Sequence, residues 1–347
     1  MSGSSLDGLD LAYVEFSYSD SRWTFKLLAG KTKKYSMSHK QQLAHAHHLP
    51  GEQLVSLDYA FGLMIGKTCK EFMRQHRIRH VDFICSHGHT VFHQPQKGFT
   101  LQIGNGNAIH AVTGLPVVND FRSLDVLRGG EGAPLVPVGD HFLFADYDIC
   151  LNLGGIANLS LKQNGKRVAF DICFANMGLN YLAGKLNMAF DKHGREASKG
   201  KVDPPLLSRL NQCYALQKKR KPSLGREGFE KWMQPLLDDE SIAIGDRLRT
   251  CCEMIGDQID RCIPTAKRKY RMIVTGGGAL NQFLISLLRN RLSAKAELIV
   301  PDKPIIEFKE AVIFGLLGVL RVRREINILK SVTHAAQDSS AGVLIGF

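Results

Sequence analysis

The sequence predicts an α/β protein with mixed sheets and more than one domain. Apolar strand-like runs alternate with segments of helical periodicity, which is typical of α/β proteins. The first two strand-like runs follow each other closely, as in an antiparallel hairpin, so we expect mixed rather than purely parallel sheets. A chain of 347 residues exceeds the usual size of one hydrophobic core, so two domains are expected.

The expected elements of the first part begin with this hairpin, over residues 11–16 and 23–28. Residues 52–75 carry an apolar stripe at helical spacing and predict a long helix. Two short buried strands are expected over 81–86 and 116–120, because apolar residues there are bounded by turn-forming ones. Each of these strands leads into a polar segment.

The later part of the chain repeats the alternation of strands and helices. We expect strands over 149–161, interrupted at Gly154-Gly155, and over 168–172, 272–275 and 298–300, with helices over 281–291 and 310–324. The segment 129–137 is too rich in Gly and Pro to form a helix.

Composition is that of a soluble globular protein, with 44% hydrophobic and 22% charged residues. No apolar run approaches the length of a membrane span, and no basic-then-apolar leader opens the sequence, so we expect a cytoplasmic protein with no membrane partner. The eight cysteines lack paired spacing, which argues against a zinc site or a disulfide framework built from them.

The net charge of +12 raises the question of a nucleic-acid partner. Basic residues cluster at 218–221 and 267–271, but no aromatic residues are interleaved in a recognised nucleic-acid motif. We therefore expect solvated basic faces that attract anionic small molecules, and no nucleic-acid partner. Strongly salt-dependent duplex binding would indicate the alternative.

Three Gly-rich turns follow or interrupt strand-like runs: 3–8, 152–158 and 275–281. Their backbone N–H groups are suited to phosphates, and the third precedes a helix. None contains a P-loop or Rossmann motif, so these two nucleotide-binding classes are excluded. Three such turns in one α/β chain indicate a nucleotide held between two lobes, whereas any one of them is equally compatible with an ordinary tight turn.

Several polar side chains next to expected strands are candidates for substrate binding or catalysis. His87, His89 and His93 have a spacing that allows zinc, but a substrate-lining segment with Thr90 as a hydroxyl donor is favoured. Arg122 is suited to a carboxylate or phosphate, with a salt bridge to a nearby Asp as the alternative. Asp171 is expected at the end of a strand, where α/β proteins place catalytic groups, although a helix cap is an alternative.

These residues lie in segments that, in order and over nearly the whole chain, resemble the anhydro-N-acetylmuramic acid kinase family of the actin/sugar-kinase/Hsp70 ATPase superfamily. The segments are 1–10, 86–95, 100–106, 113–137, 151–160, 170–176, 225–227, 276–281 and 310–311. The resemblance implies a two-lobed actin-like ATPase (ribonuclease H-like) fold with an interlobe cleft. With it we expect one lobe from 1–118 plus 311–347 and a second from 119–310.

The resemblance also implies an activity in peptidoglycan recycling. A kinase of this family hydrolyses the 1,6-anhydro ring of 1,6-anhydro-N-acetylmuramic acid, a small-molecule anhydro-amino sugar. It transfers the γ-phosphoryl group of ATP to O6 to give N-acetylmuramic acid 6-phosphate, with Mg²⁺ as the expected metal. Positioning and charge neutralisation carry most of such a phosphoryl transfer.

The resemblance assigns roles to individual positions. Asp171 matches the family's proposed catalytic base, and Thr90, Arg122 and Glu310 are expected to contact the sugar. Asp7 or Asp10 is expected to hold Mg²⁺, directly or through water. The expected ATP contacts are Gly3, Ser4, Ser5, Leu6, Asp7, Gly8, Leu9, Asp10, Gly154, Gly155, Gly276, Gly277, Gly278 and Asn281.

The sequence departs from the family pattern in two places. The family has a strand before its Met-Ser-Gly, whose absence would leave the ladder groups of neighbouring strands unpaired. Beside Asp171, the glycines and proline of the family loop are replaced by Ile172-Cys-Phe-Ala175, which requires a different backbone. Both favour the alternative of a catalytically impaired relative with a ligand-binding or regulatory role. A homodimer is expected, if one forms, to use helix 310–320 or the tail after Lys330.

Overall fold

The computed structural model describes residues 1–3, 6, 8–163, 166–214 and 224–347. The chain folds into two compact units: unit 1, formed by Met1–Leu143 and Phe308–Phe347, and unit 2, formed by Phe144–Glu307. The divisions thus lie after residues 143 and 307, whereas the sequence suggested 118 and 310. The segment between 119 and 143 belongs to unit 1 because Phe121, Leu135 and Val138 are buried in a core with the C-terminal helix.

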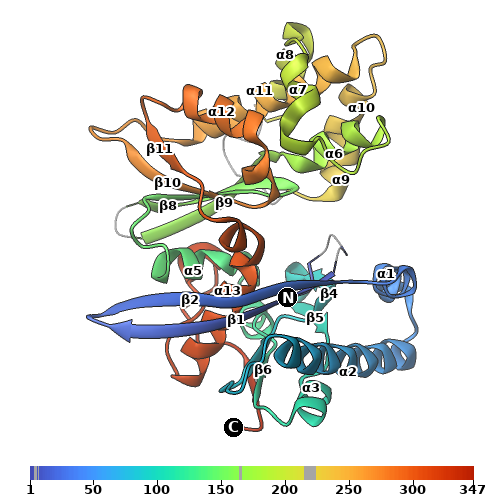
Figure 1. Cartoon of the computed structure of the whole chain (residues 1–347), viewed down its shortest axis with the longest axis vertical. Helices are drawn as coiled ribbons and strands as arrows, with labels where there is room; N and C mark the ends of the chain where they lie inside the picture. Colours follow the sequence, from blue (N-terminus) through green and yellow to red (C-terminus); the bar gives the residue numbers. More distant parts are fainter. Residues whose placement is uncertain (4–5, 7, 164–165, 215–223) are drawn as a thin grey trace. The chain divides into compact units, whose positions relative to one another are not determined.

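Unit 1 contains small sheets of two or three strands, with β1 and β2 as long strands, and the two longest helices of the described chain (Figure 1). Its strands are β1 (Gly8–Ser19), β2 (Arg22–Lys34), β3 (Ile84–Ser86), β4 (His89–Gln94), β5 (Phe99–Ile103), β6 (Val117–Asn119) and β12 (Val343–Ile345). Its helices are α1 (Met37–Ala44), α2 (Gly51–Gln75), α3 (Gly106–Thr113), α4 (Ser123–Leu127), α5 (Val136–Phe142), α14 (Lys330–Thr333) and α13 (Lys303–Val322), which enters this unit at Phe308.

The strands that the structure describes in unit 1 form three separate sheets. The predicted hairpin is confirmed, because β1 pairs with β2 in antiparallel register. A three-stranded sheet has the order β12-β6-β3, with β3 parallel and β12 antiparallel to β6. A second hairpin joins β4 to β5. The sheets are therefore mixed, as the sequence predicted.

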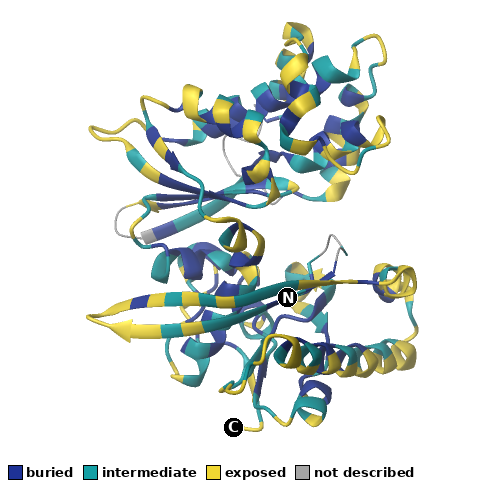
Figure 2. Cartoon of the chain, viewed as in Figure 1, coloured by how far each residue is buried: buried dark blue, intermediate teal, exposed yellow. Residues whose placement is uncertain are grey.

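The two long helices differ in how they are buried. One face of α2 carries the buried residues Phe61, Ile65 and Phe72, and exposed residues recur along the helix in Figure 2. Ile313, Leu316 and Leu317 of α13 are completely buried in the core of unit 1. The apolar character of residues 310–320 thus serves packing within this unit.

Unit 2 is built on a five-stranded sheet of order β11-β10-β7-β8-β9. The strands β10 (Tyr270–Thr275), β11 (Ala296–Ile299) and β7 (Ile149–Leu153) are parallel, and β8 (Ile156–Gln163) and β9 (Lys166–Phe174) continue the sheet in antiparallel register. The helices of this unit are α6 (Asn176–Gly184), α7 (Arg195–Lys199), α8 (Pro204–Gln212), α9 (Arg226–Gly228), α10 (Gln234–Leu237), α11 (Ile244–Cys262) and α12 (Gln282–Arg291).

Several element boundaries differ from those predicted. α13 begins at Lys303 rather than at residue 310, and α5 begins at Val136, inside the segment expected to be non-helical. The strand expected to end at Asp171 continues to Phe174, because Ile172, Cys173 and Phe174 are buried in the core of unit 2. Among the described helices, none has the length and apolar character that crossing a membrane requires.

Candidate functional site

The first candidate site lies in unit 1, where the N-terminal turn leads into β1. Ser4, Ser5 and Asp7 of this turn lie outside the described residues. Leu6 has a left-handed φ of 56°, and Ser2 forms an antiparallel bridge with Leu9. Gly8 is already the first residue of β1, where a Cβ atom would lie 2.5 Å from the carbonyl oxygen of Lys33. Gly8 is thus required by the close approach of β2.

Asp10, the remaining candidate for metal binding in this turn, lies on β1 beside β2. The hydroxyl of Thr32 donates to Asp10 Oδ1 over 2.5 Å. The structure places no cluster of three His, Cys, Asp or Glu side chains suited to a metal anywhere in its described part. The single carboxylate of Asp10 is compatible with Mg²⁺ that is brought by a nucleotide. Mg²⁺ is usually bound through one or two carboxylates together with substrate phosphates and water.

Arg122, just after β6, is held in a fixed orientation inside unit 1. Its Nε donates to His87 Nε2 over 2.9 Å, and its Nη1 donates to the carbonyl oxygen of Gly132 over 2.6 Å. Its guanidinium lies 5.9 Å from the ring centre of Phe314 on α13. Burial lowers the pKa of Arg122 to about 10, so it stays charged at neutral pH. The guanidinium N–H groups that are not used in these two bonds can bind an anionic or hydroxyl-rich ligand.

His87 acts as the hydrogen-bond acceptor that fixes Arg122. Because Nε2 accepts from Arg122, the proton of the neutral ring lies on Nδ1, which donates to the carbonyl oxygen of Gly88 over 3.1 Å. Burial and the positive charge of Arg122 lower the pKa of His87 well below its usual value, which keeps the ring neutral. From sequence, His87 was a candidate for zinc or substrate binding, and no motif indicated this pairing.

The other histidines of the motif have separate partners. His89 is hydrogen-bonded to the hydroxyl of Ser2 at 3.2 Å, and His93 Nδ1 lies 3.1 Å from Thr100 Oγ1. Gly88, at φ 72°, separates β3 from β4, so His87 and His89 do not share one strand as the zinc alternative required. Thr90, on β4, is half-buried and pairs with Gln102 of β5.

Glu310 on α13 provides a carboxyl group in the same unit, on a residue that is exposed to solvent. The surrounding protein partly desolvates this carboxyl group and raises its pKa, whereas the positive charges of Arg122 and Lys309 act in the opposite direction. The charges of Arg122 and Glu310 therefore act on each other. The neighbouring Lys309 forms a buried ion pair with Asp140 at 2.7 Å, which no sequence motif indicated.

The second candidate site lies in unit 2, at the carboxyl ends of two parallel strands. β7 leads into Gly154-Gly155 and β10 leads into Gly276–Gly278, so both Gly-rich turns lie at one edge of the sheet. Asn176, at the start of α6, donates from Nδ2 to the carbonyl oxygen of Leu153 over 2.9 Å. The N–H groups of Asn176 and Met177 donate to the carbonyl oxygens of Gly154 and Gly155, so the start of α6 is joined to the first turn by hydrogen bonds.

The glycines of these turns differ in how much space surrounds their Cα atoms. Gly276 has φ 80°, and a Cβ atom there would lie 2.5 Å from Asn152 Oδ1 and 2.8 Å from the backbone of Leu153. A Cβ atom on Gly155 would meet only Met177, at 3.7 Å or more. Gly276 is thus required by the fold itself, whereas Gly155 leaves open space that a ligand can use. Asn281 caps α12, because its Oδ1 accepts from the N–H of Leu284 over 3.0 Å.

Asp171, the candidate base, lies within β9 rather than at its end. It is opposite Asn158 of β8, where the ladder has an irregularity, and its Oδ2 accepts from the N–H of Leu224 over 2.8 Å. This bond joins Asp171 to the residue just before the segment 225–227 that carries part of the family resemblance. The Ile172–Ala175 replacement is buried in the core of unit 2, which explains its apolar character.

Comparisons with known proteins identify one family. The family model described as anhydro-N-acetylmuramic acid kinase matches residues 1–346. A protein of this name from Vibrio cholerae is 34% identical over 360 residues, which cover 99% of this chain and 96% of that protein. Another, from Gloeobacter violaceus, is 33% identical and covers 97% of this chain and 95% of its own.

Proposed function

Because the chain belongs to the anhydro-N-acetylmuramic acid kinase family, we propose that it phosphorylates 1,6-anhydro-N-acetylmuramic acid at O6 with ATP while hydrolysing the anhydro ring. The match of the family model over residues 1–346 carries this proposal. The buried polar groups in unit 1 and the Gly-rich edge of the sheet in unit 2 support it. The phosphorylated product would enter peptidoglycan recycling.

In the proposed reaction, unit 1 supplies sugar contacts. Arg122 would bind an oxygen of the sugar through the N–H groups that its bonds to His87 and Gly132 leave available. Glu310 and Thr90 would complete these contacts. A planar, preoriented guanidinium suits a ligand that must be held in one geometry for two bond changes at neighbouring atoms.

Unit 2 would supply the catalytic base and contacts to the nucleotide. Asp171 would take a proton from the water that attacks the anomeric carbon, and its bond from the N–H of Leu224 would orient the carboxylate. The Gly154-Gly155 turn would face phosphates, and the turn at Gly276–Gly278, with Asn281, would face adenosine.

The N-terminal turn is the proposed phosphate and metal-binding segment of unit 1. Gly3, Leu6 and Leu9 would approach the phosphates through their backbone, together with Ser4, Ser5 and Asp7 outside the described residues. Asp10 would hold Mg²⁺, directly or through water, and Mg²⁺ would neutralise charge on the phosphates.

The test is ADP release from Mg-ATP with and without 1,6-anhydro-N-acetylmuramic acid. Release that depends on the sugar is expected, and release that ignores it, or no release, would refute the proposal. Asp171→Asn should lower the rate by roughly 10²–10⁴-fold, the usual contribution of a general base. Asp203→Asn is the matched control, because Asp203 Oδ1 also accepts a backbone N–H, from Leu206 over 2.7 Å, at the start of α8. The control should remain active.

A further inference from the structure

A loop built largely of glycine carries one of the two hydrogen-bond acceptors that hold Arg122. Residues 129–132 read Gly-Gly-Glu-Gly, and the side chain of Glu131 is exposed. The loop therefore buries no side chain of its own, and its position depends on the hydrogen bonds of its backbone. The carbonyl oxygen of Gly132 is the acceptor, for Arg122 Nη1 over 2.6 Å.

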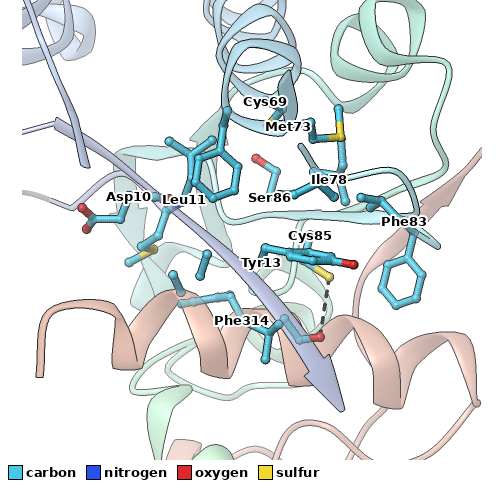
Figure 3. Close-up of a pocket in the computed structure, with 18 of the residues that line it drawn as sticks. Asp10, Leu11, Tyr13, Cys69, Met73, Ile78, Phe83, Cys85, Ser86 and Phe314 are labelled. Carbon is cyan, nitrogen blue, oxygen red and sulfur yellow. Dashed lines mark hydrogen bonds between the residues drawn. The ribbon is translucent and has the colours of Figure 1, made fainter. Parts of the chain in front are cut away.

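Two further supports of Arg122 come from packed elements of unit 1. His87, which accepts from Nε, is buried directly after β3. Phe314, 5.9 Å from the guanidinium, lies on α13. Figure 3 shows Phe314 on this helix, and a hydrogen bond that joins the helix to β3, from Cys85 Sγ to the carbonyl oxygen of Gly315 over 3.6 Å. The core thus fixes these two supports, whereas the glycine loop needs fixation of another kind.

The first half of the loop is held by ordinary turn bonds at the end of α4. The N–H of Gly129 donates to the carbonyl oxygen of Val126 over 3.0 Å, and that of Gly130 donates to the carbonyl oxygen of Asp125 over 2.9 Å. A Cβ atom on Gly130 would overlap Asp125 Oδ2. The loop therefore passes directly over the carboxylate of Asp125.

The second half of the loop is held by two residues that are far apart in the sequence. The N–H of Gly132 donates to Asp125 Oδ2 over 2.8 Å, and the N–H of Glu131 donates to the carbonyl oxygen of Thr333, in α14, over 2.7 Å. The hydroxyl of Thr333 donates to Asp125 Oδ1 over 2.8 Å, so the two residues are also bonded to each other. We call this pair the Asp125–Thr333 clamp.

The clamp is well suited to hold its partners rigidly. Both side chains are almost completely buried, and a buried carboxylate is costly unless donors are directed at its oxygens. Here one oxygen of Asp125 accepts from the loop and the other accepts from α14. A shift of Gly132 would therefore break a bond to a buried charge, which resists movement of the loop.

Given the proposed function, on which this role rests, we propose that the Asp125–Thr333 clamp positions Arg122 for the anhydro-sugar. The clamp fixes Gly132, and Gly132 fixes Nη1 of the guanidinium. The remaining N–H groups of Arg122 are then presented to the sugar in one orientation. Asp125 and Thr333 are positioning residues that act through Arg122. One interpretation of the sequence was a salt bridge between Arg122 and a nearby Asp, whereas the structure links Asp125 to Arg122 through Gly132.

The first test measures ADP release by the full-length protein at saturating Mg-ATP while the concentration of 1,6-anhydro-N-acetylmuramic acid is varied. Thr333→Val removes the hydroxyl at nearly constant shape. It should raise KM for the sugar about threefold to tenfold, the usual effect of one hydrogen bond, and leave KM for ATP unchanged. Thr333→Ser keeps the hydroxyl and should restore KM for the sugar. An unchanged KM in Thr333→Val would overturn the proposal.

A double-mutant cycle separates positioning from a general loss of structure. In an Arg122→Met background, Thr333→Val should leave kcat/KM for the sugar unchanged, because residues that act through one group are not additive. The same loss with and without Arg122 would overturn the proposal. Thr68→Val is the matched control, since Thr68 is a buried threonine of unit 1 whose hydroxyl donates to the carbonyl oxygen of Met64 over 2.8 Å, within α2. An equal rise of KM in this control would also overturn it.

A second readout requires no sugar. In protein labelled with ¹⁵N-arginine, the signals of Arg122 are identified by their loss in Arg122→Met. Thr333→Val should speed the exchange of the Arg122 guanidinium protons with water, because the bond to Gly132 is loosened, whereas Thr333→Ser and Thr68→Val should not. Unchanged exchange in Thr333→Val would overturn the proposal. If the unchanged protein shows no sugar-dependent ADP release, the proposed function fails, and proton exchange still decides whether the clamp positions Arg122.

Discussion

Arg122 donates from Nε to Nε2 of His87 over 2.9 Å, so a neutral histidine fixes the plane of a half-buried guanidinium. Lysine cannot reproduce this bond together with the one to Gly132, because its ammonium is a single point on a flexible chain. Arg122→Lys should therefore raise KM for the anhydro-sugar by at least about tenfold, the effect of a lost charge-assisted hydrogen bond. KM for ATP should change little. An unchanged KM for the sugar would remove Arg122 from the sugar site.

The two Gly-rich turns of unit 2 should respond differently to alanine. Gly276→Ala places a Cβ atom 2.5 Å from Asn152 Oδ1 at φ 80°, so it should lower Tm and activity together. Gly155→Ala meets only Met177, at 3.7 Å or more, so Tm should stay within about 2 °C, as for a change that adds no strain. If the Gly155 backbone approaches phosphates closely, KM for ATP should nevertheless rise. Equal KM values in Gly155→Ala and the unchanged protein would contradict that role.

The buried ion pair between Asp140 and Lys309 makes a prediction about stability alone. Both side chains are almost completely buried and their charged atoms are 2.7 Å apart. Lys309→Met removes the cation that lies against this buried carboxylate and should lower the free energy of unfolding by about 3–5 kcal/mol. The double variant Asp140→Leu/Lys309→Met should recover most of this loss. Urea unfolding measures the free energy of unfolding of the single and the double variant. A double variant no more stable than Lys309→Met would argue against an electrostatic cause of the loss.

The lowered pKa of His87 gives stability a specific pH dependence. The unfolded chain takes up a proton at this residue below about pH 6.5, whereas the folded protein does not until a lower pH. The unfolded state then binds more protons, so the free energy of unfolding falls as the pH is lowered from 6.5 towards the folded pKa. Between pH 7.5 and 5.5 the unchanged protein should lose roughly 1 kcal/mol more than His87→Gln does. Urea unfolding at the two pH values tests this, and parallel losses would exclude His87 as the cause.

Elements with strong local patterns were predictable from sequence. The β1–β2 hairpin, α2, and the strands before the Gly-rich turns were recognised from alternation, helical spacing and turn residues. β12 was missed because three apolar residues between glycines have no recognisable period, and they form a strand only through long-range pairing with β6. The extension of β9 past Asp171 was missed because the family's loop was expected there, although Ile172, Cys173 and Phe174 are apolar.

The candidate site was predictable by residue type but not by contact. The resemblance indicated Arg122 and Asp171, yet the partners that orient them, His87 and the N–H of Leu224, depend on folding. His87 belonged to a motif that also suits zinc. The protonation state of His87 is set by burial and by the charge of Arg122. Neither can be inferred from a single sequence.

The division of the chain has a consequence for its synthesis on the ribosome. Unit 2 is one continuous stretch, Phe144–Glu307, and can fold as soon as that stretch has left the exit tunnel. Unit 1 cannot complete its fold at that stage, since most of α13, from Phe308 onward, belongs to its core and β12 (Val343–Ile345) pairs with β6 at the edge of its sheet. Until translation ends, the nascent N-terminal part exposes apolar surface that α13 will later cover. We therefore expect chaperone dependence during expression to reside in unit 1, and truncation from the C-terminus to affect it first.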